Sequence, residues 1–118
     1  MWEIEATDQF VEWWEDLSLP QQTALEARVE LLAEQGPSLR RPAAERIQTS
    51  RHHNMKELRA SEGGALRVLF AFDPRRQVIL LLGGDKSGHW NEWYEVAVPA
   101  ADDLYDEYLD ELRREGLI

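Results

Sequence analysis

Four basic side chains in the middle of the chain are the residues best suited to chemistry: Lys56, Arg59, Arg67 and Lys86. The acids closest to them in sequence are Glu57 and Asp85, and two carboxylates cannot neutralise four cations. The cations would therefore repel one another unless they shared a further anion. Phosphate is such an anion, and arginine binds it through paired hydrogen bonds. The four cations therefore predict a phosphate-binding site, whereas a single arginine on a strand more often has a carboxylate partner.

Histidines flank these cations on both sides. His52 and His53 precede them, and His89 follows. An imidazole can transfer a proton near neutral pH, although each of the three also fits an ordinary polar surface position. Trp90, Trp93 and Tyr94 come next and could stack on nucleobases, but aromatic side chains in a small protein more often belong to the core.

Several other kinds of site are disfavoured by composition. The chain has no cysteine and three histidines, so a thiolate or histidine-rich metal site is not expected. The glycines between residues 83 and 88 lack the spacing of a nucleotide phosphate loop. We therefore expect neither a metal nor a cofactor.

Charge is divided unevenly along the 118 residues, whose net charge is −10. Residues 36–89 hold ten Lys/Arg against five acids, whereas the rest of the chain holds three Lys/Arg against eighteen acids. This contrast suggests two surfaces with different partners. Solvated acidic helix faces would explain the flanks but not the basic middle.

Two helices are expected to follow a short strand over residues 2–5. The first is capped by Thr7 or Asp8 and has apolar residues at positions 10, 13, 14 and 17. The second starts at a capping box of Ser18 and Gln21 and ends at Gly36. The short connection between them predicts an antiparallel helical hairpin.

The second half of the chain predicts three strands and a helix. Residues 37–54 lack a period and are expected to form a loop or an irregular lead-in to a strand. Strands are expected over residues 55–59, 66–73 and 77–82, the last broken by Gly83-Gly84, and a helix is expected after Pro99. The order β-α-α-β-β-β-α predicts a single α+β domain over residues 1–118, with the helical hairpin packed on a mostly antiparallel sheet.

The beginning of the chain is acidic and has no basic segment followed by an apolar one, so no secretory signal is expected. The longest apolar run, residues 78–82, is too short to span a membrane. These features predict a cytoplasmic protein without a membrane partner.

Three segments together resemble a known family: HNMKELR, LRVLFAFDPRRQVILLLGGDKSG, and the W…WY…VPAADDLYDEYL that follows. The chain is similar to the HigB-like, phage-derived branch of the RelE/ParE toxin superfamily, most closely from Asn54 to Leu109. The resemblance implies a RelE/ParE-like core, a ribosome-associated mRNA endoribonuclease that inhibits translation, and a helix-turn-helix antitoxin. It implies contact with DNA only through that antitoxin.

The resemblance also suggests roles for the basic residues. Arg59 and Arg67 match the family's strand arginines, Lys86 matches the lysine after its central strand, and Lys56 matches a position that is often basic. We expect the two arginines to clamp a phosphate, while Lys56, Lys86 or His53 transfers protons without a metal ion. The candidate RNA contacts are Arg51, His52, Arg75, Arg76 and His89.

Two other functions remain open at this stage. The same scaffold could inhibit DNA gyrase without any nuclease activity, as ParE-like toxins do. It could also be a degenerate binding module with no enzymatic activity.

Overall fold

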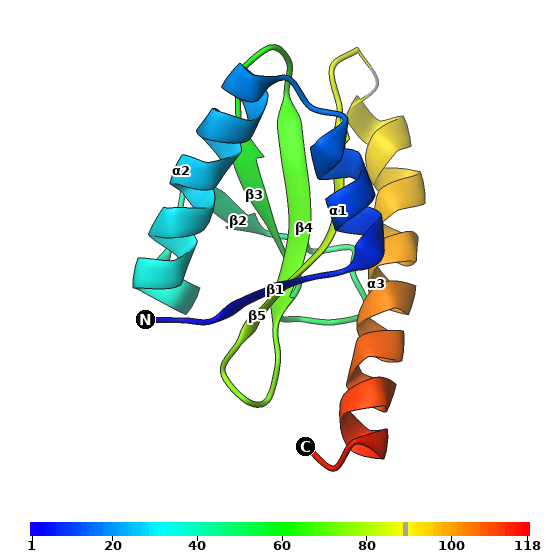
Figure 1. Cartoon of the computed structure of the whole chain (residues 1–118). Helices are drawn as coiled ribbons and strands as arrows, with labels where there is room; N and C mark the ends of the chain where they lie inside the picture. The colour runs from blue at the N-terminus through cyan, green and yellow to red at the C-terminus, as the bar shows by residue number, and fades with distance from the viewer. Residues whose placement is uncertain (89) are drawn as a thin grey trace.

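The strand predicted around residues 66–73 has apolar side chains on both of its faces, so both faces of the sheet need a cover. The computed structural model, which describes residues 1–88 and 90–118, provides one on each side (Figure 1). Helices α1 (Asp8–Glu15) and α2 (Leu19–Gln35) cover one face, and α3 (Trp90–Arg114) covers the other. The expected α+β architecture is confirmed.

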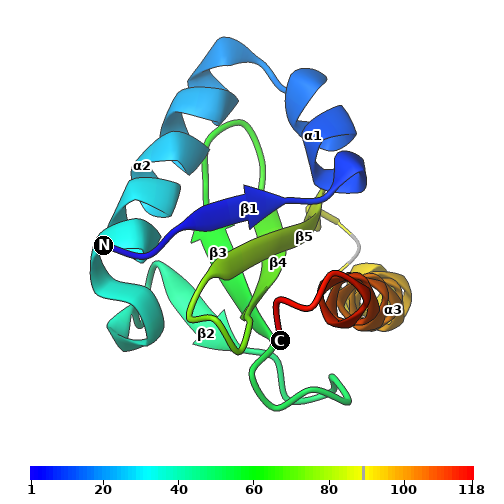
Figure 2. The same ribbon diagram turned by 60° about the horizontal axis from the view of Figure 1, so that its bottom comes forward.

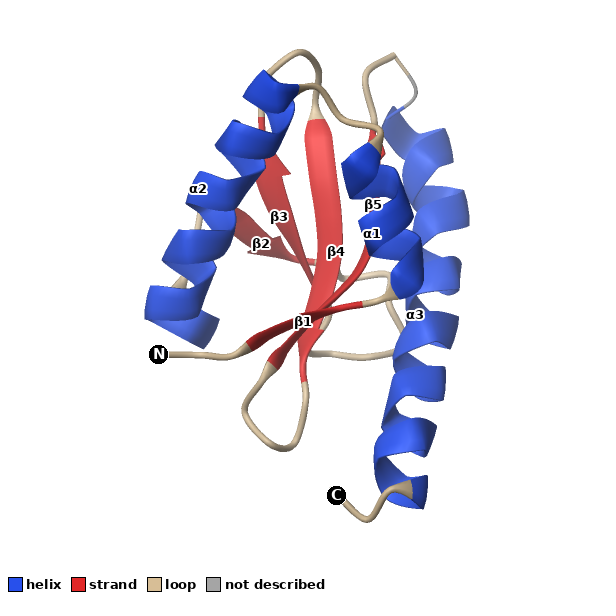
Figure 3. Ribbon diagram, viewed as in Figure 1, coloured by secondary structure: helices blue, strands red, loops and turns tan. Residues whose placement is uncertain are grey.

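The sheet has five strands in the order β1-β5-β4-β3-β2. Their bounds are β1 Ile4–Ala6, β2 Ala44–Arg46, β3 Lys56–Ala60, β4 Leu66–Phe72 and β5 Val78–Asp85. Only β1 is parallel to its neighbour, β5, and the other pairs are antiparallel (Figure 3). The sheet is therefore mostly antiparallel, as predicted, with β4 at its centre.

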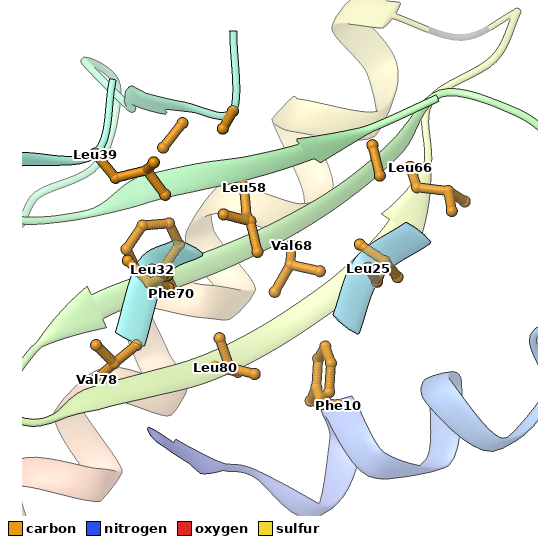
Figure 4. Close-up of a cluster of buried hydrophobic side chains, with 13 residues drawn as sticks. Phe10, Leu25, Leu32, Leu39, Leu58, Leu66, Val68, Phe70, Val78 and Leu80 are labelled. Carbon is orange, nitrogen blue, oxygen red and sulfur yellow. The ribbon is translucent and has the colours of Figure 1, made fainter. Parts of the chain in front are cut away.

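The helical hairpin starts and ends where the sequence predicts. The Thr7 side chain caps α1 by accepting from the Phe10 N–H, and Ser18 and Gln21 form the full capping box of α2. A short 3-10 turn, η1 (Gly36–Ser38), follows α2. Figure 4 shows the side chains that the hairpin buries against β3, β4 and β5, among them Leu25, Leu32 and Phe70.

Helix α3 begins ten residues before the position that the sequence suggested, and it continues through Pro99. The expectation that the helix would start after Pro99 is therefore wrong. A proline inside a helix removes one hydrogen bond, and here Ala97, Val98 and Ala101 bury themselves against the sheet around it. Figure 2 shows α3 lying alone on its face of the sheet. No helix of the described residues has the length and apolarity needed to cross a bilayer.

Strand β5 runs through Gly83 and Gly84 to Asp85, so the expected break at these glycines is also wrong. A register shift opposite Leu69 and Phe70 turns two successive residues, Leu81 and Leu82, toward α3. Gly83 then faces α1 and Gly84 faces α3. A Cβ atom would lie 2.1 Å from the Trp13 ring at Gly83 and 2.2 Å from the Trp93 ring at Gly84. The glycines are needed because two tryptophans pack directly on the strand.

Strand β2 lies in the segment expected to be a loop or an irregular lead-in. The strand has only three residues, and apolar and polar residues do not alternate along it. Its own sequence therefore does not indicate a strand, which forms through hydrogen bonding to β3. This edge strand matters because it brings Glu45 opposite Glu57.

The contact between Gly83 and Trp13 predicts a stability effect. Gly83→Ala should lower the free energy of unfolding by about 1–3 kcal/mol, because the added methyl group forces the indole ring to move. Urea denaturation measures this loss. In a Trp13→Leu background the cost should shrink, and an equal cost in both backgrounds would contradict the proposed clash.

Candidate functional site: a cluster of cations beside helix α3

Three of the four predicted cations lie together at the end of the sheet where α3 begins, the top of Figure 1. The register places Arg59 of β3 directly opposite Arg67 of β4, and Arg67 in turn opposite Gly84 of β5. Lys86 follows the end of β5, and its backbone N–H donates to the Ala65 carbonyl at 3.1 Å. All three face α3, and Arg67 does so because alternation along β4 turns it away from Val68 and Phe70, which face the hairpin.

A buried carboxylate, Glu57, lies at the centre of this cluster and is only 3% exposed. The Arg59 Nε donates to it at 2.8 Å, the Tyr94 hydroxyl donates to it at 2.6 Å, and the Arg67 Nε lies 3.8 Å away. Because a buried charge is costly unless it is paired, the carboxylate and the guanidinium groups hold one another in place.

A second carboxylate reaches Arg59 from the edge of the sheet. The Arg59 NH2 group donates to Glu45 at 2.7 Å, and Glu45 also pairs with Arg41. Burial alone would lower the pKa of Arg59, but the hydrogen bond to Glu57 and the two nearby carboxylates raise it above its ordinary value. Arg59 therefore stays charged and bridges two acids that would otherwise repel one another across the β2–β3 pair.

Tyr94 joins α3 to the cluster. Its neighbour Trp93 packs on Gly84, which brings the helix close enough for the Tyr94 hydroxyl to reach Glu57. Burial, together with the hydrogen bond to Glu57, raises the pKa of Tyr94 to about 12. The phenol therefore remains a hydrogen-bond donor at neutral pH.

Lys86 packs against the ring of the same tyrosine. Its side chain is largely buried, and the Nζ atom lies 5.3 Å from the centre of the Tyr94 ring. Burial lowers the pKa of Lys86, and the charge of Arg67 lowers it further. Lys86 is therefore a better proton donor than an exposed lysine.

One hydrogen-bond donor of Arg67 has no acceptor among the described residues. Its NH1 group donates to the Leu66 carbonyl at 2.8 Å, but among the described residues its buried Nε has no hydrogen-bond partner. Buried polar atoms rarely remain unpaired. Arg67 is therefore a member of the cluster whose hydrogen-bonding groups are incompletely satisfied within the described residues.

Lys56, the fourth predicted cation, faces the other side of the sheet. Alternation along β3 puts it opposite Phe70, on the side of the helical hairpin. Its Nζ atom donates to the Pro37 carbonyl at 3.2 Å and lies over the Phe72 ring. The prediction that all four cations belong to one site is therefore wrong for Lys56.

His53, Arg75 and Arg76 lie at the opposite end of the sheet from Arg67. Five residues of β4 separate the two ends, or roughly 17 Å. Arg75 pairs with Asp73 and Glu5 and donates to the Tyr108 hydroxyl, while Arg76 packs over the Trp2 ring. These residues do not join the cation cluster, although sequence proximity had suggested His53 as a proton donor or acceptor there.

Arg51 and His52 are paired with the acidic face of α3. Arg51 forms ion pairs with Asp103 and Asp106, and His52 Nε2 lies 2.8 Å from Asp106. Both residues therefore fasten the loop before β3 to the helix. His89 and the side chain of Trp90 lie outside the part of the chain that the structure describes.

Sequence reasoning missed the three partners of the cations. Glu57 was noted only as a nearby acid, Glu45 lies on the unpredicted strand β2, and Tyr94 was grouped with aromatic core residues. A signal for Glu57 existed, because it shares the face of β3 that carries Arg59. No group of three or more His, Asp or Glu residues in the described ranges is arranged to hold a metal ion.

Comparisons of the whole chain agree with the fold. A free mutant of the Escherichia coli toxin RelE aligns with a TM-score of 0.61 at 12% identity, over 83% of this chain and 95% of that one. The RelBE2 toxin–antitoxin complex of Mycobacterium tuberculosis gives a TM-score of 0.55 at 13% identity, over 71% of this chain and 96% of that one. The fold is that of the RelE toxins.

Sequence relatives identify the family. The model of the phage-derived Gp49-like proteins matches residues 12–106. A Mycobacterium tuberculosis protein named as the toxin HigB3 is 44% identical over 86% of this chain and 88% of its own length. Another, named as the toxin HigB2, is 47% identical over 70% of this chain, which spans 42% of that relative. The chain belongs to the Gp49-like family and is a HigB-type toxin with the fold of RelE.

The tyrosines, of which Tyr105 is buried and Tyr94 and Tyr108 are half-buried, predict a pH effect that can be measured. Burial raises the pKa of each of the three tyrosines, that of Tyr94 to about 12. Tyrosinate absorbance should therefore rise well above pH 10 in the folded protein and near pH 10 in urea. Because the raised pKa of Tyr94 favours its neutral form, its stabilising contribution is complete below about pH 10 and is lost as the pH approaches 12.

Tyr94→Phe is the matched control, since it should remove the part of the folded titration near pH 12. Coinciding folded and unfolded titrations would contradict the burial of these phenols.

Proposed function

We propose that this toxin is an endoribonuclease that cleaves mRNA through attack by a ribose 2′-hydroxyl on the adjacent phosphate. The observation that carries the proposal is the convergence of Arg59, Arg67 and Lys86 around Glu57 and Tyr94. The reaction needs three functions: stabilisation of charge on the phosphorane, a proton acceptor and a proton donor. This cluster contains a candidate for each.

The arginines supply the charge stabilisation. A scissile phosphate that binds at the cluster would be held by the guanidinium groups of Arg67 and Arg59 in exchange for part of their pairing with Glu57 and Glu45. Both groups are held before substrate arrives, so little reorganisation is needed as negative charge develops on the phosphorane.

Glu57 is the candidate proton acceptor. In the free protein its charge is stabilised by Arg59 and by the Tyr94 hydroxyl. A bound phosphate competes for Arg59 and Arg67, which frees a carboxylate oxygen of Glu57 to accept a hydrogen bond from the 2′-hydroxyl. Substrate binding thus creates the base that the 2′-hydroxyl needs.

Lys86 is the candidate proton donor, since burial and Arg67 lower its pKa. As the bond between the 2′-oxygen and phosphorus forms, the bond to the 5′-oxygen breaks. Glu57 takes the 2′-hydroxyl proton, and Lys86 gives a proton to the leaving 5′-oxygen. The products are a 2′,3′-cyclic phosphate and a free 5′-hydroxyl, and solvent restores both side chains. Because only RNA carries the 2′-hydroxyl, the substrate class is RNA.

The partners follow from the family and from charge. RelE relatives occur in solved toxin–antitoxin complexes, and the HigB resemblance makes a helix-turn-helix antitoxin the expected partner. A net charge of −10 gives little long-range attraction for free RNA, which favours mRNA presented on the ribosome.

The phosphate clamp is tested by Arg67→Ala, with Arg114→Ala as a control at the exposed end of α3. Arg67→Ala should reduce the cleavage rate by about 10²–10³-fold, because it removes a preorganised donor to the phosphorane. Mapping of new mRNA 5′ ends after expression measures the effect. Growth arrest with DNA-damage signalling and intact mRNA would contradict the nuclease and indicate gyrase inhibition.

Proton donation by Lys86 predicts a pH dependence. The donor must be protonated, so cleavage should fall as pH rises through the pKa of Lys86, which lies below that of an ordinary lysine. Lys86→Arg should weaken cleavage and move this decline to higher pH, because guanidinium keeps its proton. Rates measured across the alkaline range provide the test, and an unchanged profile would rule out Lys86 as the donor.

A further inference from the structure

A pocket of about 310 Å³ lies beside the cation cluster and has no role in the chemistry proposed above. Its lining residues come from the first half of α3 and from the loop before β3: Thr49, Asn91, Tyr94, Glu95, Val98 and Pro99. The α3 residues are spaced at i, i+3, i+4, i+7 and i+8, so they share one side of the helix. The pocket therefore lies between that side of α3 and Thr49.

The lining combines flat apolar surface with a polar edge. Tyr94, Val98 and Pro99 provide the apolar walls, while Asn91, Glu95 and Thr49 provide hydrogen-bonding groups. Unpaired nucleobases are bound in proteins by this combination, through stacking on aromatic or apolar surface and hydrogen bonds to the base edge.

Two kinds of hydrogen-bond acceptor in the pocket lining come from Glu95, its side-chain carboxylate and its backbone carbonyl. Its side chain offers two carboxylate oxygens as hydrogen-bond acceptors. Its backbone carbonyl is the one that a residue at position 99 would normally satisfy, and Pro99 has no N–H to donate. The ligand edge that fits this part of the pocket must therefore carry N–H donors.

Tyr94 connects the pocket to the cation cluster. The same side chain lines the pocket and donates from its hydroxyl to Glu57. A phosphate held among Arg59, Arg67 and Lys86 therefore has the base of its own or the adjoining nucleotide within reach of the pocket.

We propose that this pocket is a nucleobase subsite that selects guanine at the cleavage position. Guanine presents two neighbouring donors, N1–H and the N2 amino group, which match the Glu95 carboxylate, and its O6 can accept from Asn91 or Thr49. Uracil presents a single N–H between two carbonyl oxygens, which a carboxylate repels. The inference rests on the proposed ribonuclease function for its place in the reaction, but base binding can be measured without cleavage.

Binding is tested with the four nucleoside 3′-monophosphates, which contain no bond that the enzyme would cut. In titrations followed by NMR, 3′-GMP should shift the amide signals of Asn91 and Glu95 and should bind about tenfold more tightly than 3′-UMP. Glu95→Gln should remove most of that ratio. Glu107→Gln, an exposed change farther along α3, should preserve it. Equal affinities for the four nucleotides, or shifts confined to other residues, would overturn the subsite.

Mapped mRNA ends separate this proposal from the nuclease itself. Guanine enriched at one position beside the cuts, and lost in Glu95→Gln while cutting continues, supports the subsite. Cutting with the same base preference in both proteins overturns the subsite and leaves the nuclease standing. Absence of cutting combined with Glu95-dependent binding of 3′-GMP overturns the nuclease and supports the subsite as a binding site.

Discussion

The burial of the Glu57 carboxylate constrains the rest of the site. A charge that is almost fully removed from water must be paired, and three elements supply its partners: Arg59 from its own strand β3, Arg67 from β4 and Tyr94 from α3. Arg59 extends the network to β2 through Glu45. The position of the edge strand, the orientation of the arginines and the contact of α3 with the sheet therefore depend on one another.

Close contact between α3 and the sheet depends in turn on the irregularity in β5. The register shift turns Gly84 toward the helix and places it beside Arg67. Without a side chain at this position, the Trp93 ring rests on the strand itself. A larger residue would lift the start of α3 and separate Tyr94 from Glu57. The glycine thus serves the site through packing, with no direct role in chemistry.

Local patterns predicted the parts of the fold that local physics determines. The capping box at Ser18, the alternation that turns Arg67 away from the hairpin, and the lysine that follows β5 were all readable from the sequence. Pairing over long sequence distances was not. The short strand β2 exists only through its pairing with β3, and α3 passes through Pro99 because its packing compensates for the lost hydrogen bond. Lys56 was grouped with the other cations because it shares a predicted strand with Arg59, although alternation places residues 56 and 59 on opposite faces of that strand.

The folded structure also shows that ion pairs neutralise much of the positive charge of the basic middle segment, residues 36–89. Acids that are distant in sequence neutralise much of it, since Arg51 pairs with α3 and Arg75 pairs with β1. Arg59 likewise has two carboxylate partners. An incoming phosphate therefore has to replace an existing partner, and the net gain is smaller than the charge of the arginines suggests. Selectivity follows from this exchange, because a substrate competes well only when its base and its phosphate are both accommodated. Free polyanions that bind through charge alone would have little advantage at such a site.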